Sequence, residues 1–421
     1  MIQALGLLTN PEDTLKDRLA LPDLLHFEYR HQQSYFDDST LQLTAVLKTP
    51  ELECLITPSS DTVTAALQQC SNLTQVSSTL DVPILNLNAP LPLAPLAIEK
   101  PWGRELWYTG IEKRGVCTMG GIPIPWILDC LPVTVSGGTY QPPLLLKLLQ
   151  PLPDEIFGDL YFEAHAQKTE VYIVTDINRQ AWPDGVGRIR YGFDKLKLEQ
   201  YSSDDNFRQA YLDAVNRYAE VRSAIDLELD QFQNGRLADV SDRKAWLAGI
   251  DDELLKKERD LRHEMESFTA LHDLQEGDVV HVPPLTPHSL QHGVTVVEFQ
   301  TPHYERFILS FAQKVLTQDH WDTQEALTRI NLNTEHVLDR SDGELIADFE
   351  DFKVMRLKLD PGNSIRIEKS GYAILMGLRG DIDLDGLIIT PGSVRYIPAG
   401  CQLDFVNKGK KESVTLLAIP K

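Results

Sequence analysis

The sequence predicts a mainly β protein whose short strands form a barrel or sandwich, and three observations support this class. Between residues 98 and about 194, short apolar runs alternate with Gly and Pro, which is typical of closely spaced strands and turns. The same pattern resumes at Leu274 and again at Asp348. Between these β regions, from about Lys195, apolar residues recur at helical spacing instead.

Two helices are predicted inside this β pattern. Residues 205–232 place aromatic and aliphatic residues at helical spacing, and a second helix is expected at 242–268. Asn234 and Gly235 provide a break between them. Two neighbouring helices in a β-rich chain indicate an inserted helical hairpin at 195–271. A further helical stretch is expected around residues 307–330.

The first 97 residues carry no recognisable chemistry. Strand-like runs at Leu41–Leu47 and Leu52–Thr57 alternate with turn residues, and the segment ends in a Pro-rich stretch from Pro83 to Pro95. Two interpretations stay open: a small separate domain, or strands that complete a neighbouring sheet. The role of this segment is unknown.

The C-terminal β region repeats the turn pattern of an earlier segment. Both segments have Gly, then Pro after five residues, then a third residue after four more: Gly277, Pro283 and His288 in the first, and Gly392, Pro398 and Leu403 in the second. The second segment keeps the turn but has Leu in place of His. We therefore expect residues 348–421 to bind no metal and to act structurally.

Charge and cysteine usage restrict the classes of partner and the compartment. The 421 residues include 62 acidic and 40 basic side chains, a formal net charge of −22, which repels nucleic acid and anionic membranes. A small anionic substrate remains compatible with this charge if a few Arg or Lys side chains converge. The five cysteines show no CxxC spacing, and no signal peptide or membrane span is visible. These features predict a cytoplasmic protein.

The segment EAHAQKTE carries the candidate metal ligands. Glu163 and His165 are two positions apart, so on a strand their side chains project from the same face. Glu170 follows a short turn and begins another apolar strand. We expect a hairpin here to aim all three side chains into one interior. The alternative is that the two glutamates are solvated and His165 is a hydrogen-bonded core residue.

A fourth ligand has to come from a distant strand, and His288 after the Pro-rich turn PPLTP is the best candidate. Two neutral imidazoles and two carboxylates suit one divalent ion, with zinc preferred and manganese or iron also compatible. The candidate site is therefore Glu163, His165, Glu170 and His288.

These motifs resemble those of a known family. The turn from Gly277 to His288 resembles the second signature motif of the cupin superfamily, and EAHAQKTE resembles the first. Within that superfamily the chain is most similar to the type I mannose-6-phosphate isomerases. The motifs that carry the resemblance, in family order, are KPWG (100–103), PLLLKLL (143–149), EAH (163–165), KTEVYI (168–173), YGF (191–193), GDVVHVPPLTPH (277–288) and EFQ (298–300).

The resemblance covers residues 98–315 well and 348–421 more loosely. It implies a metal-bearing cupin domain at 98–194 plus 272–320 and a degenerate C-terminal cupin domain at 321–421. The helical insertion at 195–271 and the N-terminal segment at 1–97 complete the predicted organisation.

The resemblance also implies a metal-dependent aldose–ketose isomerase that acts on a sugar phosphate, as in the conversion of mannose 6-phosphate to fructose 6-phosphate. Lys168 and Arg306 are then the expected catalytic residues. Substrate contacts are expected from Arg306, Lys314 and Glu298. The alternatives are an exposed turn lysine for Lys168 and surface ion pairing for Arg306.

Two rival functions remain open. Glu163 stands where that family has glutamine, and Arg306 comes two residues before the family's arginine, which favours a metal-binding cupin that binds or senses a carbohydrate without converting it. A cupin oxygenase is the third possibility, because two His and two carboxylates also hold Fe(II).

Overall fold

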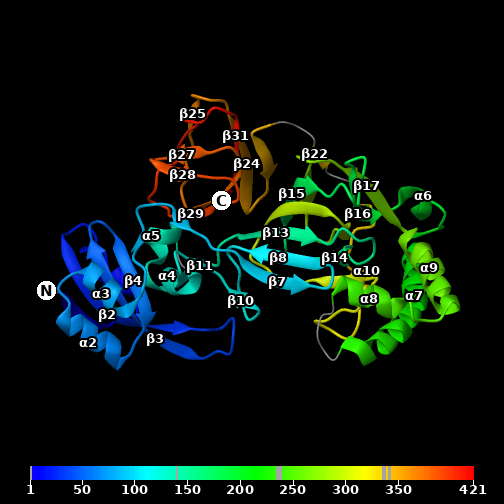
Figure 1. The fold of residues 1–421 in the computed structure, drawn as a ribbon, viewed down its shortest axis with the longest axis horizontal. Helices are drawn as coiled ribbons and strands as arrows, with labels where there is room; N and C mark the ends of the chain where they lie inside the picture. The colour runs from blue at the N-terminus through cyan, green and yellow to red at the C-terminus, as the bar shows by residue number, and fades with distance from the viewer. Residues whose placement is uncertain (1, 139–140, 234–238, 334–337, 340–342) are drawn as a thin grey trace. The chain divides into compact units, whose positions relative to one another are not determined.

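The structure is a computed structural model that describes residues 2–138, 141–233, 239–333, 338–339 and 343–421 (Figure 1). The chain forms two compact units, each described here by itself. The first unit contains residues 1–96, 107–146 and 341–421, and the second contains residues 97–106 and 147–340. Residues 107–146, which the predicted organisation grouped with the metal-bearing domain, pack in the first unit.

The N-terminal part of the first unit is a sheet with the strand order β1-β2-β3-β4-β5. Val46 and Leu55 of this sheet pack against Leu73 and Val76 of a helix, forming a small apolar core. Both expected strands are present, and the helices beside them were not predicted. The elements are β1 (Gln3–Leu7), α1 (Pro11–Leu15), β2 (Asp23–Gln32), β3 (Thr40–Thr49), β4 (Glu53–Pro58), α2 (Asp61–Gln69), α3 (Leu73–Leu80) and β5 (Leu85–Asn86).

Short strands and two helices connect this sheet to the rest of the chain. They are β6 (Leu91–Pro92), β7 (Leu96–Lys100), β8 (Gly103–Trp107), β9 (Ile111–Glu112), β10 (Gly115–Val116), β11 (Thr118–Met119), β12 (Ile122–Pro123), α4 (Ile124–Cys130) and α5 (Pro132–Ser136).

The C-terminal part of the first unit is built from a sheet in the order β23-β24-β31-β26-β29-β6 and another in the order β25-β30-β27-β28. Side chains from both sheets share one apolar cluster that includes Leu357, Leu384 and Phe405. The strands are β23 (Leu345–Asp348), β24 (Phe352–Leu359), β25 (Ser364–Arg366), β26 (Ala373–Arg379), β27 (Ile382–Leu384), β28 (Leu387–Ile389), β29 (Val394–Ile397), β30 (Asp404–Val406) and β31 (Ser413–Pro420).

The second unit also contains two sheets, with the orders β22-β18-β15-β20-β13-β8-β7 and β17-β16-β19-β14-β21. Their strands are β13 (Leu145–Pro151), β14 (Phe162–Ala164), β15 (Glu170–Ile177), β16 (Gly187–Phe193), β17 (Thr269–Leu274), β18 (Val279–Val282), β19 (His288–Leu290), β20 (Val294–Gln300), β21 (Phe307–Ser310) and β22 (Leu338–Asp339). The helices are α6 (Lys195–Leu198), α7 (Asp204–Gln233), α8 (Val240–Leu247), α9 (Asp252–Glu266) and α10 (Thr323–Leu327).

Side-chain alternation divides the strands of the second unit between two cores. Tyr172 and Val174 of β15 share one apolar cluster with Ile189 of β16 and Ile308 of β21, so this cluster lies between the two sheets. On β14, Phe162 instead joins a second cluster formed with α7 and α9. Consecutive residues of β14 therefore point alternately into the sheet sandwich and toward the helices.

The helices lie between the paired strands β16 and β17, close to where the sequence placed them. The predicted helix at 205–232 corresponds to α7. The predicted helix at 242–268 is divided into α8 and α9, because Asp251 begins a new helix by accepting hydrogen bonds from the backbone N–H groups of Glu253 and Leu254. The predicted break at Asn234 and Gly235 lies outside the described residues.

Two sequence expectations about local structure were wrong. The segment 163–170 does not form a hairpin, because β14 and β15 belong to different sheets and the chain crosses between them. The helical stretch expected around 307–330 is a strand, β21, followed by loop and the short helix α10. Phe307 and Leu309 of β21 pack toward the helices and Ile308 packs between the sheets, which is strand alternation rather than helical spacing.

The two repeated turns have similar local structure and different third residues. Gly277 and Gly392 both have positive φ, +93° and +80°, and each precedes a short strand, β18 or β29. The first turn leads to His288 at the start of β19. The second leads to Leu403, which is fully buried in the apolar cluster of the C-terminal sheets.

All five cysteines are free, and none forms a disulfide. None of the helices in the described ranges has the length and apolar character needed to span a bilayer.

The burial of Leu403 leads to a stability prediction. Leu403→Ala should lower the free energy of unfolding by about 2–5 kcal/mol, because it removes buried methyl groups and leaves a cavity. Ile388→Ala on β28 is the matched control, since Ile388 is about half exposed and surface changes cost about 0.5 kcal/mol or less. Urea unfolding measures both changes. Equal unfolding midpoints for the two variants would contradict the packing of Leu403.

Candidate metal centre

The candidate ligands come from both sheets of the second unit. Glu163 on β14 pairs in register with His288 on β19, and Glu170 begins β15 in the other sheet. Phe162 and Ala164 point toward the helices, so Glu163 points into the sandwich. The connection from β14 to β15 brings His165 to the same end of the sandwich. Residues separated by more than 120 positions thus meet at one place.

The donor atoms of Glu163, His165 and His288 all lie within 4.8 Å of one another. Glu170 joins them through both histidines: its Oε1 is 3.7 Å from His165 Nε2, and its Oε2 is 3.1 Å from His288 Nε2. Glu163 Oε1 is 3.9 Å from His165 Nε2. Ligand atoms of a tetrahedral zinc ion with bonds of about 2.0–2.2 Å are roughly 3.3–3.6 Å apart, so these separations fit an ion with little rearrangement.

Each imidazole is held with Nε2 toward this cluster. His165 Nδ1 lies 2.8 Å from the carbonyl oxygen of Glu305, and His288 Nδ1 lies 3.0 Å from that of Thr286. A carbonyl oxygen only accepts, so both Nδ1 atoms donate, and the neutral rings carry their lone pairs on Nε2. This orientation by a second hydrogen bond is usual for metal-bound histidine.

Two buried atoms of the cluster that could bind a metal have no hydrogen-bond partner among the described residues. They are His165 Nε2 and Glu163 Oε2. Buried polar atoms are normally satisfied, because leaving one unpaired costs about 1–3 kcal/mol. Arg306 Nη1 is 3.7 Å from Glu163 Oε2, which is an ion pair at long range and no hydrogen bond. A divalent cation would satisfy both atoms, so the residues fit such an ion.

The pKa shifts of His165 and Glu170 favour a bound cation, whereas that of His288 means that a proton has to leave this ring before it can bind one. Burial, followed by the charge of Lys168, holds the pKa of His165 well below its usual range, so this ring is neutral. Burial alone would raise the pKa of Glu170, but the charge of Lys168 and hydrogen bonding with His288 outweigh it, and the pKa lies well below its ordinary value. Burial would also lower the pKa of His288, but hydrogen bonding to Glu170 reverses this and raises it.

Lys168 is buried and its Nζ lies 2.6 Å from Glu170 Oε1. The structure therefore places it beside the cluster and not at an exposed turn. Arg306 lies over the Tyr161 ring at 4.6 Å, and its Nη2 donates to Thr317 Oγ1 at 2.7 Å. The carboxylate next to Arg306 is that of Glu163. The alternative of a surface ion pair, which the sequence left open, therefore does not describe this contact.

The structure separates the two remaining predicted residues. Glu298 on β20 is buried next to the cluster, and burial together with the negative charge of Glu170, opposed by Lys147, raises its pKa to about 8. Lys314 lies elsewhere: it lines a cavity beside Arg222, away from the ligand atoms.

The sequence analysis did not identify three side chains that lie around the cluster, namely Tyr172, Lys147 and Gln300. Tyr172 Oη lies 3.1 Å from His288 Nε2 and 3.3 Å from Glu170 Oε2. Lys147 Nζ donates to Gln300 Oε1 at 2.6 Å and is 3.5 Å from Glu298 Oε1. A usable signal was available, since a lysine inside the apolar run PLLLKLL and polar residues ending VTVVEFQ occupy positions expected to be buried.

Comparison with known proteins supports the fold. No protein-family profile matches the sequence, and no curated protein sequence matches it. Mannose 6-phosphate isomerase from Bacillus subtilis is similar in structure, with a TM-score of 0.54 and 15% identity over 78% of this chain and 99% of that chain.

Two further structures are similar at the same level. A lysine-to-alanine variant of phosphomannose isomerase from Salmonella typhimurium has a TM-score of 0.56 and 13% identity, over 79% of this chain and 100% of that one. A zinc-bound mannose 6-phosphate isomerase has a TM-score of 0.55 and 12% identity, over 79% and 99%. At these identities the likeness establishes a shared, mainly β fold.

Metal binding is directly testable. The protein should bind about one divalent ion per chain, and His165→Ala or His288→Ala should each weaken zinc binding at least about tenfold, beyond the effect of losing an orienting partner. His320→Ala is the control, because His320 is exposed and pairs with Asp319. Competition with a fluorescent zinc chelator measures the affinities. Unchanged affinity in both cluster variants would contradict the site.

Zinc affinity should also depend on pH through His288. Its raised pKa means that a proton must leave this ring when an ion binds, so affinity falls as pH drops through that pKa. The expected slope below the pKa is about tenfold per pH unit for one displaced proton. His165, with its lowered pKa, should add nothing in this range. Chelator competition from about pH 5.5 to 8 tests this, and a flat profile would contradict it.

Proposed function

We propose that this protein is a metal-dependent aldose–ketose isomerase acting on a sugar phosphate, with mannose 6-phosphate and fructose 6-phosphate as the first pair to test. The observation that carries the proposal is the convergence of two imidazole nitrogens and two carboxylates, with a buried lysine 2.6 Å from one of the carboxylates. The fold likeness to mannose 6-phosphate isomerases supports the same reaction class.

The proposed ion is zinc, held by Glu163, His165, Glu170 and His288. When bound, it polarises the carbonyl and hydroxyl oxygens of the sugar. Lys168 is the proposed acid–base group that moves a proton between C1 and C2, because it is the nearest basic side chain that is not a ligand. The carboxylate of Glu170 positions the ammonium group of Lys168.

Arg306 is the proposed phosphate-binding group. It lies at the edge of the cluster, partly exposed, and its fork of donors suits bidentate binding of a phosphate. Glu298 is proposed to bind a sugar hydroxyl, because its raised pKa of about 8 keeps the carboxyl group protonated at neutral pH and able to donate. The position of Lys314 offers no support for a substrate contact at this site.

We also propose that the region around β24 to β31 is a degenerate copy of the metal-bearing cupin domain, which would comprise 98–194 plus 272–320, with 195–271 as its helical insertion. Leu403 stands in the copy where His288 stands in the metal-bearing domain, and it packs into an apolar cluster. The copy would then be structural.

A second candidate function is a metal-dependent carbohydrate binder without turnover. The geometry of Arg306 favours it: the guanidinium already contacts Tyr161, Thr317 and Glu163, so binding a phosphate would require it to rearrange. The carboxylate of Glu163 favours it too, since two carboxylates cancel the formal charge of a divalent ion and weaken its polarising effect.

A coupled assay for fructose 6-phosphate formation separates the two functions. Zinc-loaded protein should isomerise mannose 6-phosphate or a close sugar phosphate, and Lys168→Met should lower kcat by about 100- to 10,000-fold. Lys256→Met is the matched control, because Lys256 is exposed on α9 and pairs with Asp260. Glu163→Gln should retain or raise activity, since it restores positive charge to the ion.

Arg306→Ala should act mainly through KM if Arg306 grips the phosphate equally in the ground and transition states. Metal-loaded protein that isomerises no member of a panel of aldose phosphates and free aldoses would rule out the isomerase. Calorimetric binding of one of those sugars by the same inactive protein would establish the binder instead.

A further inference from the structure

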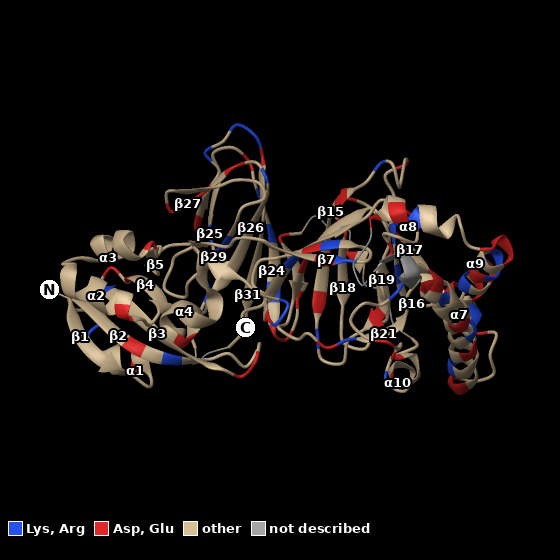
Figure 2. Cartoon of the chain, turned by 60° about the horizontal axis from the view of Figure 1, so that its bottom comes forward, with Lys and Arg blue, Asp and Glu red and all other residues tan. Residues whose placement is uncertain are grey.

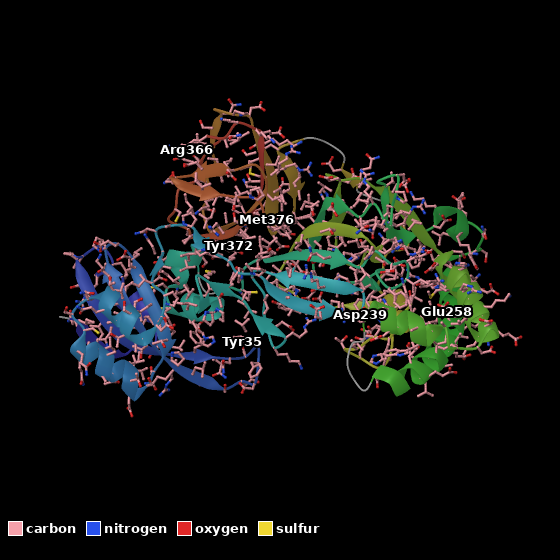
Figure 3. The ribbon with its side chains drawn as sticks, in the orientation of Figure 1. Tyr35, Asp239, Glu258, Arg366, Tyr372 and Met376 are labelled. Atoms are coloured by element: carbon pink, nitrogen blue, oxygen red, sulfur yellow. The ribbon has the colours of Figure 1, made fainter. Side chains whose placement is uncertain are left out.

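A cavity of about 270 Å³ lies among the helices of the second unit, apart from the metal ligands. Its walls come from α7, α8 and α9, from residues 312–314 and 316, and from Pro101, Ile156 and Phe157. Figure 3 labels Glu258, which contributes to the wall from α9. None of the described residues that line this cavity belongs to the candidate metal centre.

The cavity combines an apolar lining with an excess of positive charge. Leu229, Leu247 and Leu255 contribute to the apolar part. Basic side chains outnumber acidic ones by five to two: Arg222, Arg243, Arg259, Arg262 and Lys314 against Asp226 and Glu258. Charges of both signs occur along α7 and α9 (Figure 2), and the whole chain carries −22. A local excess of three positive charges therefore runs against the overall balance.

The two acidic side chains are already engaged. Asp226 Oδ1 accepts from Arg222 Nε at 3.0 Å, and Glu258 Oε1 accepts from Arg262 Nε at 3.2 Å and from Tyr218 Oη at 2.9 Å. Both lining carboxylates therefore pair with arginines other than Arg243.

Arg243 is only 6% exposed, yet no carboxylate among the described residues lies within 4.0 Å of it. Its Nη1 donates to the Pro101 carbonyl at 2.9 Å and to the Gln313 side chain, and its guanidinium lies over the Phe157 ring. Its Nε is buried and has no hydrogen-bond partner. The charges of Asp239 and Asp154 act on Arg243 only at longer range, and burial lowers the pKa of its guanidinium. An anion in the cavity would offset this cost of burying the cation.

We propose that this cavity is a binding site for a small amphipathic anion, with a carboxylate or phosphate group against Arg243 and Arg259 and an apolar body among the leucines. The volume supports a ligand of this size: a dry cavity of about 150 Å³ holds benzene, and drug-sized ligands need about 300–1,000 Å³. A short acyl chain or a single aromatic ring fits between these limits.

The cavity also borders the segment that contains Thr317, the hydrogen-bond acceptor of Arg306. Residues 312–314 and 316 line the cavity, and the next residue, Thr317, accepts the hydrogen bond from Arg306 Nη2. A bound anion would order this segment. Hydrogen exchange of residues 312–317 should therefore slow when the cavity is filled.

Calorimetric titration of the zinc-loaded full chain with octanoate tests the proposal. We expect one saturable site with a Kd between about 10 μM and 1 mM, the range open to a ligand of some ten heavy atoms. Hexanol carries an apolar chain without charge and sodium acetate carries the charge without a chain, and both should bind at least about tenfold more weakly.

Substitutions locate the site and separate it from the metal centre. Arg243→Met should weaken octanoate binding at least about tenfold, the usual size of a lost charge-assisted hydrogen bond. Arg259→Met should weaken it severalfold without risk to folding, because Arg259 is exposed. Arg217→Met is the matched control on α7, where Arg217 pairs with Glu264 outside the cavity. His288→Ala should leave octanoate affinity unchanged, whatever the fate of the isomerase proposal.

The outcomes are decisive even if Arg243→Met fails to fold by circular dichroism, because Arg259→Met then decides. Octanoate binding that is absent up to about 10 mM in the wild type overturns the proposal. Equal binding by the wild type and Arg259→Met also overturns it, as does loss of binding in His288→Ala, which would place octanoate at the metal centre.

Discussion

The alternation of side chains along β14 and β15 is the constraint on which the rest of the second unit depends. On β14, Phe162 and Ala164 pack against the helices, so Glu163 has to face the interior between the sheets. On β15, Glu170 shares its face with Tyr172 and Val174, which lie in that interior. A shift of one residue in either strand would move its carboxylate out of the cluster and into apolar contacts on the opposite, also buried, face.

Because the ligands face an interior that is otherwise apolar, their charges have to be compensated locally. Lys168 provides the closest compensation for Glu170. Glu298 has a raised pKa of about 8 and needs no such compensation at neutral pH, and Lys147 beside it donates its 2.6 Å hydrogen bond to Gln300. These residues all occupy inward-facing positions at one end of the sandwich, while Val294 and Val296 continue the same face of β20 as apolar core. The apolar cluster between the two sheets holds them together, and this allows charged and polar side chains to be buried at one end of the sandwich.

Much of the fold and of the candidate site was predictable from local patterns. The strand class, the helices between β16 and β17, and the grouping of Glu163, His165 and His288 followed from spacing and turn chemistry. The hairpin expected at 163–170 failed because spacing alone does not say which sheet a strand joins, and pairing with β19 and β21 decided it. The helix expected around 307–330 failed because a short apolar run that is buried on both faces, such as 307–309, does not distinguish a strand from a helix by its period. The sequence marks Lys147 as a buried polar residue, but its role and that of Tyr172 depend on partners more than 100 residues away, which spacing does not reveal.

The main chain, rather than any side chain, sets the tautomer of both histidines. The acceptors are the carbonyl oxygens of Glu305 and Thr286, and every amino acid supplies the same group at those positions. Side-chain mutagenesis would therefore not detect these two acceptors, because an alanine scan through 304–306 or 285–287 leaves both carbonyl groups in place. Homologous sequences could vary freely at these two positions while the ring orientation stayed constant. Homologues would have to keep the path of the backbone at these two positions. The residues to compare among them are therefore those that fix this path.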